Sequence, residues 1–161
     1  MLRTLSLSLW VGAIAFFAFG VAPVAFHLLP TAHEAGLVVG GSLHVLHVLA
    51  FSCGVVYVAA SLLGLTVHPL SPAALTRGAL VVVMLFLTAY SAFSILPRME
   101  VDRAQAGGFI EALSQNAPVR VDFDRLHHMS ERVEGSVLLL GLLALVLTSL
   151  EPRLDTHTAG R

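Results

Sequence analysis

The stretch FDRLHHMSERVEGSVLLLGLLALVL, residues 123–147, combines the two features that decide the fold, a polar beginning and a long apolar end. Two adjacent histidines and two glutamates lie in its first half, and its second half carries no ionisable side chain. About 20 largely apolar residues suffice for a helix to cross the hydrocarbon core, where every backbone polar group must be satisfied internally. The stretch therefore predicts a membrane helix whose entrance carries polar groups.

The composition of the whole chain agrees with a membrane location. Charged residues make up 12% of the 161 residues and apolar residues 57%, with a mean hydropathy of +0.86. A typical soluble domain carries about 25% charged residues. Integral membrane protein is the class that these values predict, and the length suits a single membrane domain over residues 1–161, in contact with the lipid bilayer.

Net charge excludes one class of partner. Nine basic and ten acidic side chains leave a formal charge of −1, and the chain contains no lysine. A nucleic-acid binder needs a basic patch or stripe to neutralise phosphates. We therefore expect no nucleic acid among the partners.

Four stretches are apolar and long enough to cross a membrane, which predicts an all-α bundle of four transmembrane helices. Prolines separate them: Pro30 follows the first, the segment HPLSP follows the second, and Pro97 follows the third. We expect the first stretch to be an uncleaved span rather than a secretory signal, since its apolar run continues to Phe26. The predicted spans are residues 5–29, 35–65, 75–96 and 123–150.

Two segments fall outside the predicted spans. Residues 97–122 form a polar connection, in which Phe109, Ile110 and Leu113 predict a short interfacial helix. Residues 151–161 form a polar tail.

Alternation of the spans places both termini on one face of the membrane, which we name side A; the opposite face is side B. Arginines flank the spans on both sides, but the uncharged first connection favours cytoplasmic termini. The expected location is the inner (plasma) membrane of a bacterial cell.

Most of the histidines are predicted to gather in the side-B half of the bundle. His44 and His47 lie three residues apart, on one face of the second span. In the fourth span, spacing places four polar residues on one stripe at a similar depth: His127, Ser130, Glu131 and Glu134. We expect a ligand or ion pocket between helices two and four, entered from side B, because ionisable groups at membrane depth are costly. A hydrated helix start with structural hydrogen bonds is the alternative.

Three functions fit such a pocket. The first is binding or passage of a small ion, a proton or a metal species, since imidazole and carboxylate suit borderline divalent metals. The second is electron transfer by a b-type haem held between helices two and four. The third is a structural subunit without ligand. The candidate haem or metal ligands are His44, His47, His127 and His128.

Enzyme motifs are absent from the sequence: it contains no GxSxG, no HExxH and no CxxC. We therefore expect no enzymatic activity. Small residues predict close helix packing at Gly36 and Gly40, spaced four apart, and at Gly141 on the polar stripe. Such faces also suit a homo-oligomer or a larger membrane complex.

The fourth span also resembles a known family. Phe123, Leu126, His127 and Ser130 are similar to the F-x-x-L-H-x-x-S-x-x-x-N signature of the transmembrane protein 205-like family, a four-helix membrane domain of unknown function of the 4149 type. The first span, ending in GVAPVAFHLLP, resembles the aromatic-Pro-Phe pattern of that family. The resemblance implies a four-helix membrane fold and a functional role for His127 and Ser130. Glu134 stands where the signature has Asn.

Overall fold

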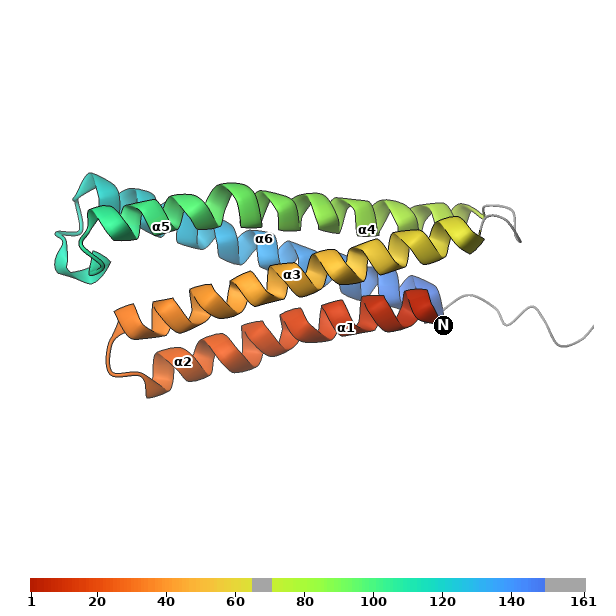
Figure 1. Cartoon of the computed structure of the whole chain (residues 1–161), viewed down its shortest axis with the longest axis horizontal. Helices are drawn as coiled ribbons and strands as arrows, with labels where there is room; N and C mark the ends of the chain where they lie inside the picture. Colours follow the sequence, from red (N-terminus) through yellow and green to blue (C-terminus); the bar gives the residue numbers. More distant parts are fainter. Residues whose placement is uncertain (65–70, 150–161) are drawn as a thin grey trace, which may run out of the picture.

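The computed structural model describes residues 1–64 and 71–149. These residues are almost entirely helical and contain no strand. Figure 1 shows the helices lying lengthwise beside one another. In chain order the elements are α1 (Leu2–Phe16), the π-helical turn η1 (Phe17–Val21), α2 (Ala22–Leu28), α3 (Ala32–Gly64), α4 (Pro72–Tyr90), the π-helical turn η2 (Ser91–Ile95), α5 (Leu96–Gln105), the 3-10 turn η3 (Ile110–Ala112) and α6 (Pro118–Ser149).

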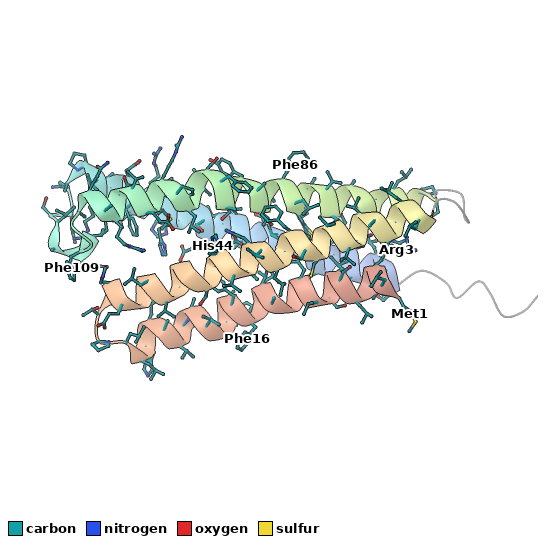
Figure 2. All side chains as sticks on the ribbon, viewed as in Figure 1. Met1, Arg3, Phe16, His44, Phe86 and Phe109 are labelled. Carbon is teal, nitrogen blue, oxygen red and sulfur yellow. The ribbon has the colours of Figure 1, made fainter. Side chains whose placement is uncertain are left out.

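Four continuous helical rods are long and apolar enough to cross a membrane, which confirms the all-α membrane fold. They are Leu2–Leu28, Ala32–Gly64, Pro72–Gln105 and Pro118–Ser149. Large apolar side chains such as Phe16 and Phe86 are more than two-thirds exposed, and Figure 2 shows both pointing away from the bundle. Such an outer surface is suited to lipid contact rather than to water.

Two of the rods contain a proline in their interior and accommodate it by a π-helical turn. The segment AFGVAP ends at Pro23 and the segment AFSILP ends at Pro97, so each proline follows an Ala-Phe pair at the same spacing. Proline has no N–H and its ring clashes with the carbonyl four residues earlier. In both rods the residue before proline bonds five residues back, Ala22 to Phe17 and Leu96 to Ser91. Each wider turn lets the helix continue past its proline.

The third rod, Pro72–Gln105, therefore extends further than the third span that the sequence predicts. A break at Pro97 was expected, but the rod continues to Gln105, and the connection shrinks to residues 106–117. Gly107 and Gly108 turn the chain there with positive φ values of 65° and 95°. The expected interfacial helix is only the short turn η3, in which Ile110 is buried. The fourth helix begins at Pro118, five residues before the predicted start. The predicted tail, residues 151–161, and most of the segment HPLSP lie outside the described residues.

The core of the bundle depends on close contact at Gly141 of α6. A Cβ atom added to Gly141 would lie 2.5 Å from Val11 Cγ2 and 3.1 Å from Met84 Cε. The packing predicted at Gly141 is thus present, and it brings α1 and α4 together on α6. Gly54 has the same role in α3, where the side chain of Leu85 on α4 occupies the space of a Cβ.

The two helical hairpins, α1–α2 with α3 and α4–α5 with α6, are closest near side A. Figure 1 shows them separating toward the end that carries α2 and α5, which is side B. Fully buried apolar side chains fill the side-A half, among them Val81, Met84, Val137 and Ala144. The bundle is therefore tightly packed in one half and splayed in the other.

Replacing Gly141 with alanine is expected to destabilise the protein. The new methyl group must displace Val11, whose branched side chain has little rotamer freedom. Overpacking of this kind costs about 1–3 kcal/mol. The measurement is the midpoint of thermal unfolding of the purified protein in detergent. Gly135→Ala is the matched control on the same helix, because nothing lies within 4 Å of its added Cβ; an equal loss in both variants would contradict the packing role.

Candidate functional site

A vestibule of about 1210 Å³ lies between the two hairpins in their side-B half. Its walls come from η1, α2, the first part of α3, α5 and the first half of α6. The volume is on the scale of a pocket for a small organic molecule. Five of the six residues predicted to form the pocket line it: His44, His127, Ser130, Glu131 and Glu134. Figure 2 shows His44 between α3 and the second hairpin.

Carboxylates dominate the charged lining of the vestibule. Arg103 is the one arginine in the lining, and five acidic residues surround the same space: Glu100, Glu111, Asp124, Glu131 and Glu134. A cleft lined by one sign of charge, with low-dielectric walls, raises the local concentration of counter-ions. The vestibule is therefore expected to attract cations and to repel anions.

Arg103 reaches across the vestibule from α5. Its guanidinium carbon lies 5.5 Å from the ring centroid of Phe123 on α6, at cation–π distance. A Cβ added to Gly36 of α3 would lie 3.2 Å from Arg103 Nη2, and one added to Gly40 would lie 4.0 Å from Nη1. The space at these two glycines is thus occupied by the guanidinium and not by the backbone of a neighbouring helix.

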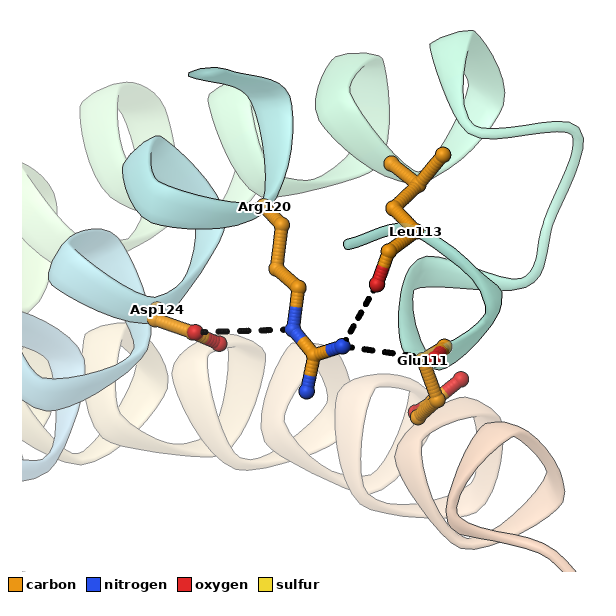
Figure 3. Close-up of polar contacts among 4 residues, drawn as sticks. All are labelled: Glu111, Leu113, Arg120 and Asp124. Atoms are coloured by element: carbon orange, nitrogen blue, oxygen red, sulfur yellow. Dashed lines mark hydrogen bonds and ion pairs between the residues drawn. The ribbon is translucent and has the colours of Figure 1, made fainter. Parts of the chain in front are cut away.

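The connection before α6 forms the rim of the vestibule and is tied to that helix by Arg120. Its Nη1 donates hydrogen bonds to the carbonyl oxygen of Leu113 at 2.7 Å and to that of Glu111 at 3.3 Å. Its Nε lies 4.0 Å from an oxygen of Asp124 (Figure 3). On the other side of the rim, the ring of His33 lies 4.7 Å from that of Phe109. These contacts hold acidic lining residues in position.

The innermost polar contact joins the two hairpins at His47 of α3 and Glu134 of α6. The Nε2 atom of His47 lies 2.9 Å from Oε1 of Glu134. His47 is 3% exposed and Glu134 is 8% exposed, so the imidazole is behind the carboxylate and only the carboxylate faces the vestibule. An unpaired charge at this depth would cost several kcal/mol, which the partner offsets.

The other predicted residues of α6 lie nearer the surface. His127 Nε2 is 3.4 Å from Glu131 Oε1, and His128 Nδ1 is 3.0 Å from Glu131 Oε2. His127 lines the vestibule and stacks on Phe123, with ring centroids 6.4 Å apart. His128 is not part of the lining. Glu131 therefore engages both histidines within one helix.

The positions of the histidines and carboxylates can be compared with what a metal or haem site at the predicted ligands would require. Within residues 1–64 and 71–149, no three His, Cys, Asp or Glu side chains are grouped closely enough to hold a metal ion. His47 is directed at Glu134, and both histidines of α6 are directed at Glu131. The geometry thus provides carboxylate–imidazole pairs rather than a pair of facing imidazoles.

Below Glu134 the bundle is closed toward side A. Val137 and Gly141 follow on the same stripe of α6, both buried, and Gly141 is in contact with Val11 and Met84. Nearer side A, Arg77 Nη1 donates to the carbonyl oxygen of Leu147 at 3.3 Å. The vestibule therefore narrows beyond Glu134, and its innermost lining residues are Leu138 of α6 and Ile14 of α1.

Sequence reasoning missed several lining residues. Glu100 and Arg103 were assigned to a connection, because Pro97 was expected to end the helix, whereas the rod carries both into the vestibule wall. Their spacing of three on one helical face was the available signal. Pairing of His47 with Glu134, 87 residues apart, has no local signal in the sequence.

Residues 5–107 match a protein family described as a domain of unknown function (DUF4149). The chain belongs to this family. No curated protein and no solved structure matches the chain. The matched DUF4149 region contains His44, His47 and both proline-containing rods, and it ends before α6. Glu134 and the other polar residues of α6 thus lie outside the match.

Removing one member of the buried pair is expected to destabilise the protein more than removing both. His47→Leu or Glu134→Leu leaves a buried polar partner unsatisfied, at a cost of about 3–5 kcal/mol. The double variant replaces the pair by apolar side chains and should lose less than the sum of the two single losses. Thermal unfolding midpoints in detergent of the wild type, the two single variants and the double variant give the coupling between His47 and Glu134. Strictly additive losses would contradict a direct interaction.

Proposed function

We propose that this protein binds small cations, protons foremost, that enter the membrane domain from side B. The observation that carries the proposal is the buried contact of 2.9 Å between His47 and Glu134 at the inner end of an acidic vestibule. Ionisable pairs inside a membrane are costly and commonly mark ion or proton pathways. Histidine is the side chain whose ordinary titration lies closest to neutral pH.

The chemistry of the pair suits one proton better than a metal. A carboxylate and an imidazole at hydrogen-bond distance share a proton between Oε1 and Nε2, and the second carboxylate oxygen remains available toward the vestibule. When one further proton binds, the net charge of the pair changes from −1 to 0, either as an imidazolium beside a carboxylate or as a neutral imidazole beside a carboxylic acid. Each change alters the electrostatic energy inside a low-dielectric bundle.

The vestibule supplies the route. Its five carboxylates surround the mouth and the walls, and Glu131 with His127 lies one helical turn above Glu134 on α6. Protons and other cations are thereby concentrated where Glu134 is accessible. Under this proposal, passage to side A would require separation of the packed layer around Gly141.

Other uses of the same site are weaker proposals. A divalent metal would rely on the lining residues His44, His127 and Glu131, and a b-type haem would need two histidines turned toward each other. A relation to the transmembrane protein 205-like family rests on the signature residues of α6, of which Glu134 is the departure. A homo-oligomer or a larger membrane complex, and the absence of enzymatic activity, also stand as proposals.

Protonation of Glu134 is expected to be visible in the infrared spectrum of the purified protein. On acidification every carboxyl group gains a C=O stretching band, and the component that belongs to Glu134 should appear as a difference between the wild-type and Glu134→Gln spectra. In liposomes with an imposed pH gradient, the same variant should reduce any protein-dependent proton flux by about tenfold or more, since one proton-carrying group typically contributes at least about 10²-fold.

The control is Asp122→Asn. Asp122 pairs with Arg125 on the exposed side of α6 and does not line the vestibule. It should retain the band and the flux. Identical wild-type and Glu134→Gln spectra over the whole pH range would contradict the proposed function, and an absorption spectrum of the same sample reports on bound haem.

A further inference from the structure

Two hydroxyl groups in the middle of α4–η2 have no partner although they are fully buried. Thr88 is 1% exposed and Ser91 is 0% exposed, and neither hydroxyl oxygen has a hydrogen bond in the described part of the chain. Hydroxyls elsewhere in the bundle behave differently. Each of five others donates to the carbonyl four residues earlier: Ser52, Ser61, Thr76, Ser136 and Thr148. The two most buried hydroxyls thus lack the hydrogen bond to a backbone carbonyl four residues earlier that these other hydroxyls make.

Helix register places these hydroxyls at the level of the His47–Glu134 pair. Gly141 of α6 packs on Met84 of α4, and the two helices run in opposite directions. Seven residues toward side B from this contact, about two turns, lie Glu134 on α6 and Ser91 on the other helix. Thr88 lies one turn before Ser91 on the same buried face, which also includes Val81 and Ile95.

The contact between α3 and α4 gives the same level independently. Gly54 packs on Leu85, and seven residues toward side B from this contact lie His47 and Ala92. The second ring nitrogen of His47, Nδ1, is buried and also has no partner. Three of the five buried unpartnered side-chain atoms among the described residues thus lie within about one helical turn of this level.

Unpartnered buried polar groups are rare in native proteins, and a bound water commonly satisfies them. The π-helical turn that begins at Ser91 locally widens the rod on the same level, and such turns are frequent at functional sites. Helix register places hydroxyl oxygens, an imidazole nitrogen and the carboxylate of Glu134 near this level. These groups both donate and accept hydrogen bonds, as water requires.

We infer that Thr88, Ser91 and His47 form a closed site for water beside Glu134, on the inner side of the vestibule. The bound water accepts and donates hydrogen bonds to the two hydroxyls and to His47 Nδ1. Its use as a proton acceptor next to the pair rests on the proposed function, whereas its occupancy does not. Water in this site extends the polar path beyond Glu134 into the centre of the bundle.

Nearly isosteric substitutions distinguish a water-binding hydroxyl from an orphan one. If Thr88 or Ser91 holds water, Thr88→Val and Ser91→Ala should each lower the thermal unfolding midpoint by about 2–4 °C in full-length protein. If the hydroxyls are orphans, their removal relieves a penalty and the midpoint should rise or stay unchanged. That result would overturn the inference. Thr148→Val is the matched control, since its hydroxyl already bonds to Ala144.

A second measurement separates this inference from the proposed function. In Ser91→Ala, the pH midpoint of the Glu134 infrared band should change by about one unit. This corresponds to a tenfold change in proton affinity. Thr88→Ser keeps the hydroxyl and should leave the midpoint in place. A normal Glu134 band with unchanged midpoints and raised stability in Thr88→Val and Ser91→Ala would overturn the water site alone. Loss of stability in both variants without any Glu134 band would overturn the proposed function alone.

Sodium is the competing guest, because hydroxyl and carboxylate oxygens also suit hard cations. If water is the guest, sodium chloride should raise the wild-type unfolding midpoint no more than choline chloride does at equal concentration. A sodium-specific rise that disappears in Ser91→Ala would overturn water as the guest.

Discussion

The interaction on which the site depends is the contact between His47 and Glu134 inside the membrane domain. His47 lies behind Glu134 and outside the vestibule lining, so Glu134 is the partner that satisfies its buried Nε2 atom. The contact joins the two hairpins in the inner part of the vestibule, where Glu134 is a lining residue. It therefore marks the boundary between a closed apolar half and an open acidic half of the same bundle.

The asymmetry between the two halves follows from side-chain size and from the prolines. Toward side A, Gly141 and Gly54 allow neighbouring helices to approach, and apolar side chains fill the remaining space. Toward side B, the π-helical turns before Pro23 and Pro97 carry both rods past their prolines. Arg103 at the end of the longer rod occupies the space at Gly36. The side-B half is consequently polar, open and rich in carboxylates.

Five of the six residues predicted to share a pocket line the vestibule, and the sixth, His47, does not. The spacing on α6 placed His127, Ser130, Glu131 and Glu134 on one stripe, because helical periodicity is a local property. His47 was grouped with His44, its neighbour on the same helix. The structure separates the two, with His44 in the vestibule lining and His47 buried behind Glu134. Glu134 is the residue of α6 that makes the buried contact.

By itself, the sequence determined the membrane location and the number of spans. Each depends only on hydropathy along a helix. Because the backbone of a helix in lipid must satisfy its own hydrogen bonds, a local apolar stretch is enough to predict a span. Tertiary structure alone decided that the helix runs through Pro97, that Arg103 fills the space at two glycines, and that His47 meets Glu134. It also decided that the hydroxyls of Thr88 and Ser91 reach the level of that pair. These features depend on the register and rotation of packed helices, which are set by contacts between residues far apart in the chain.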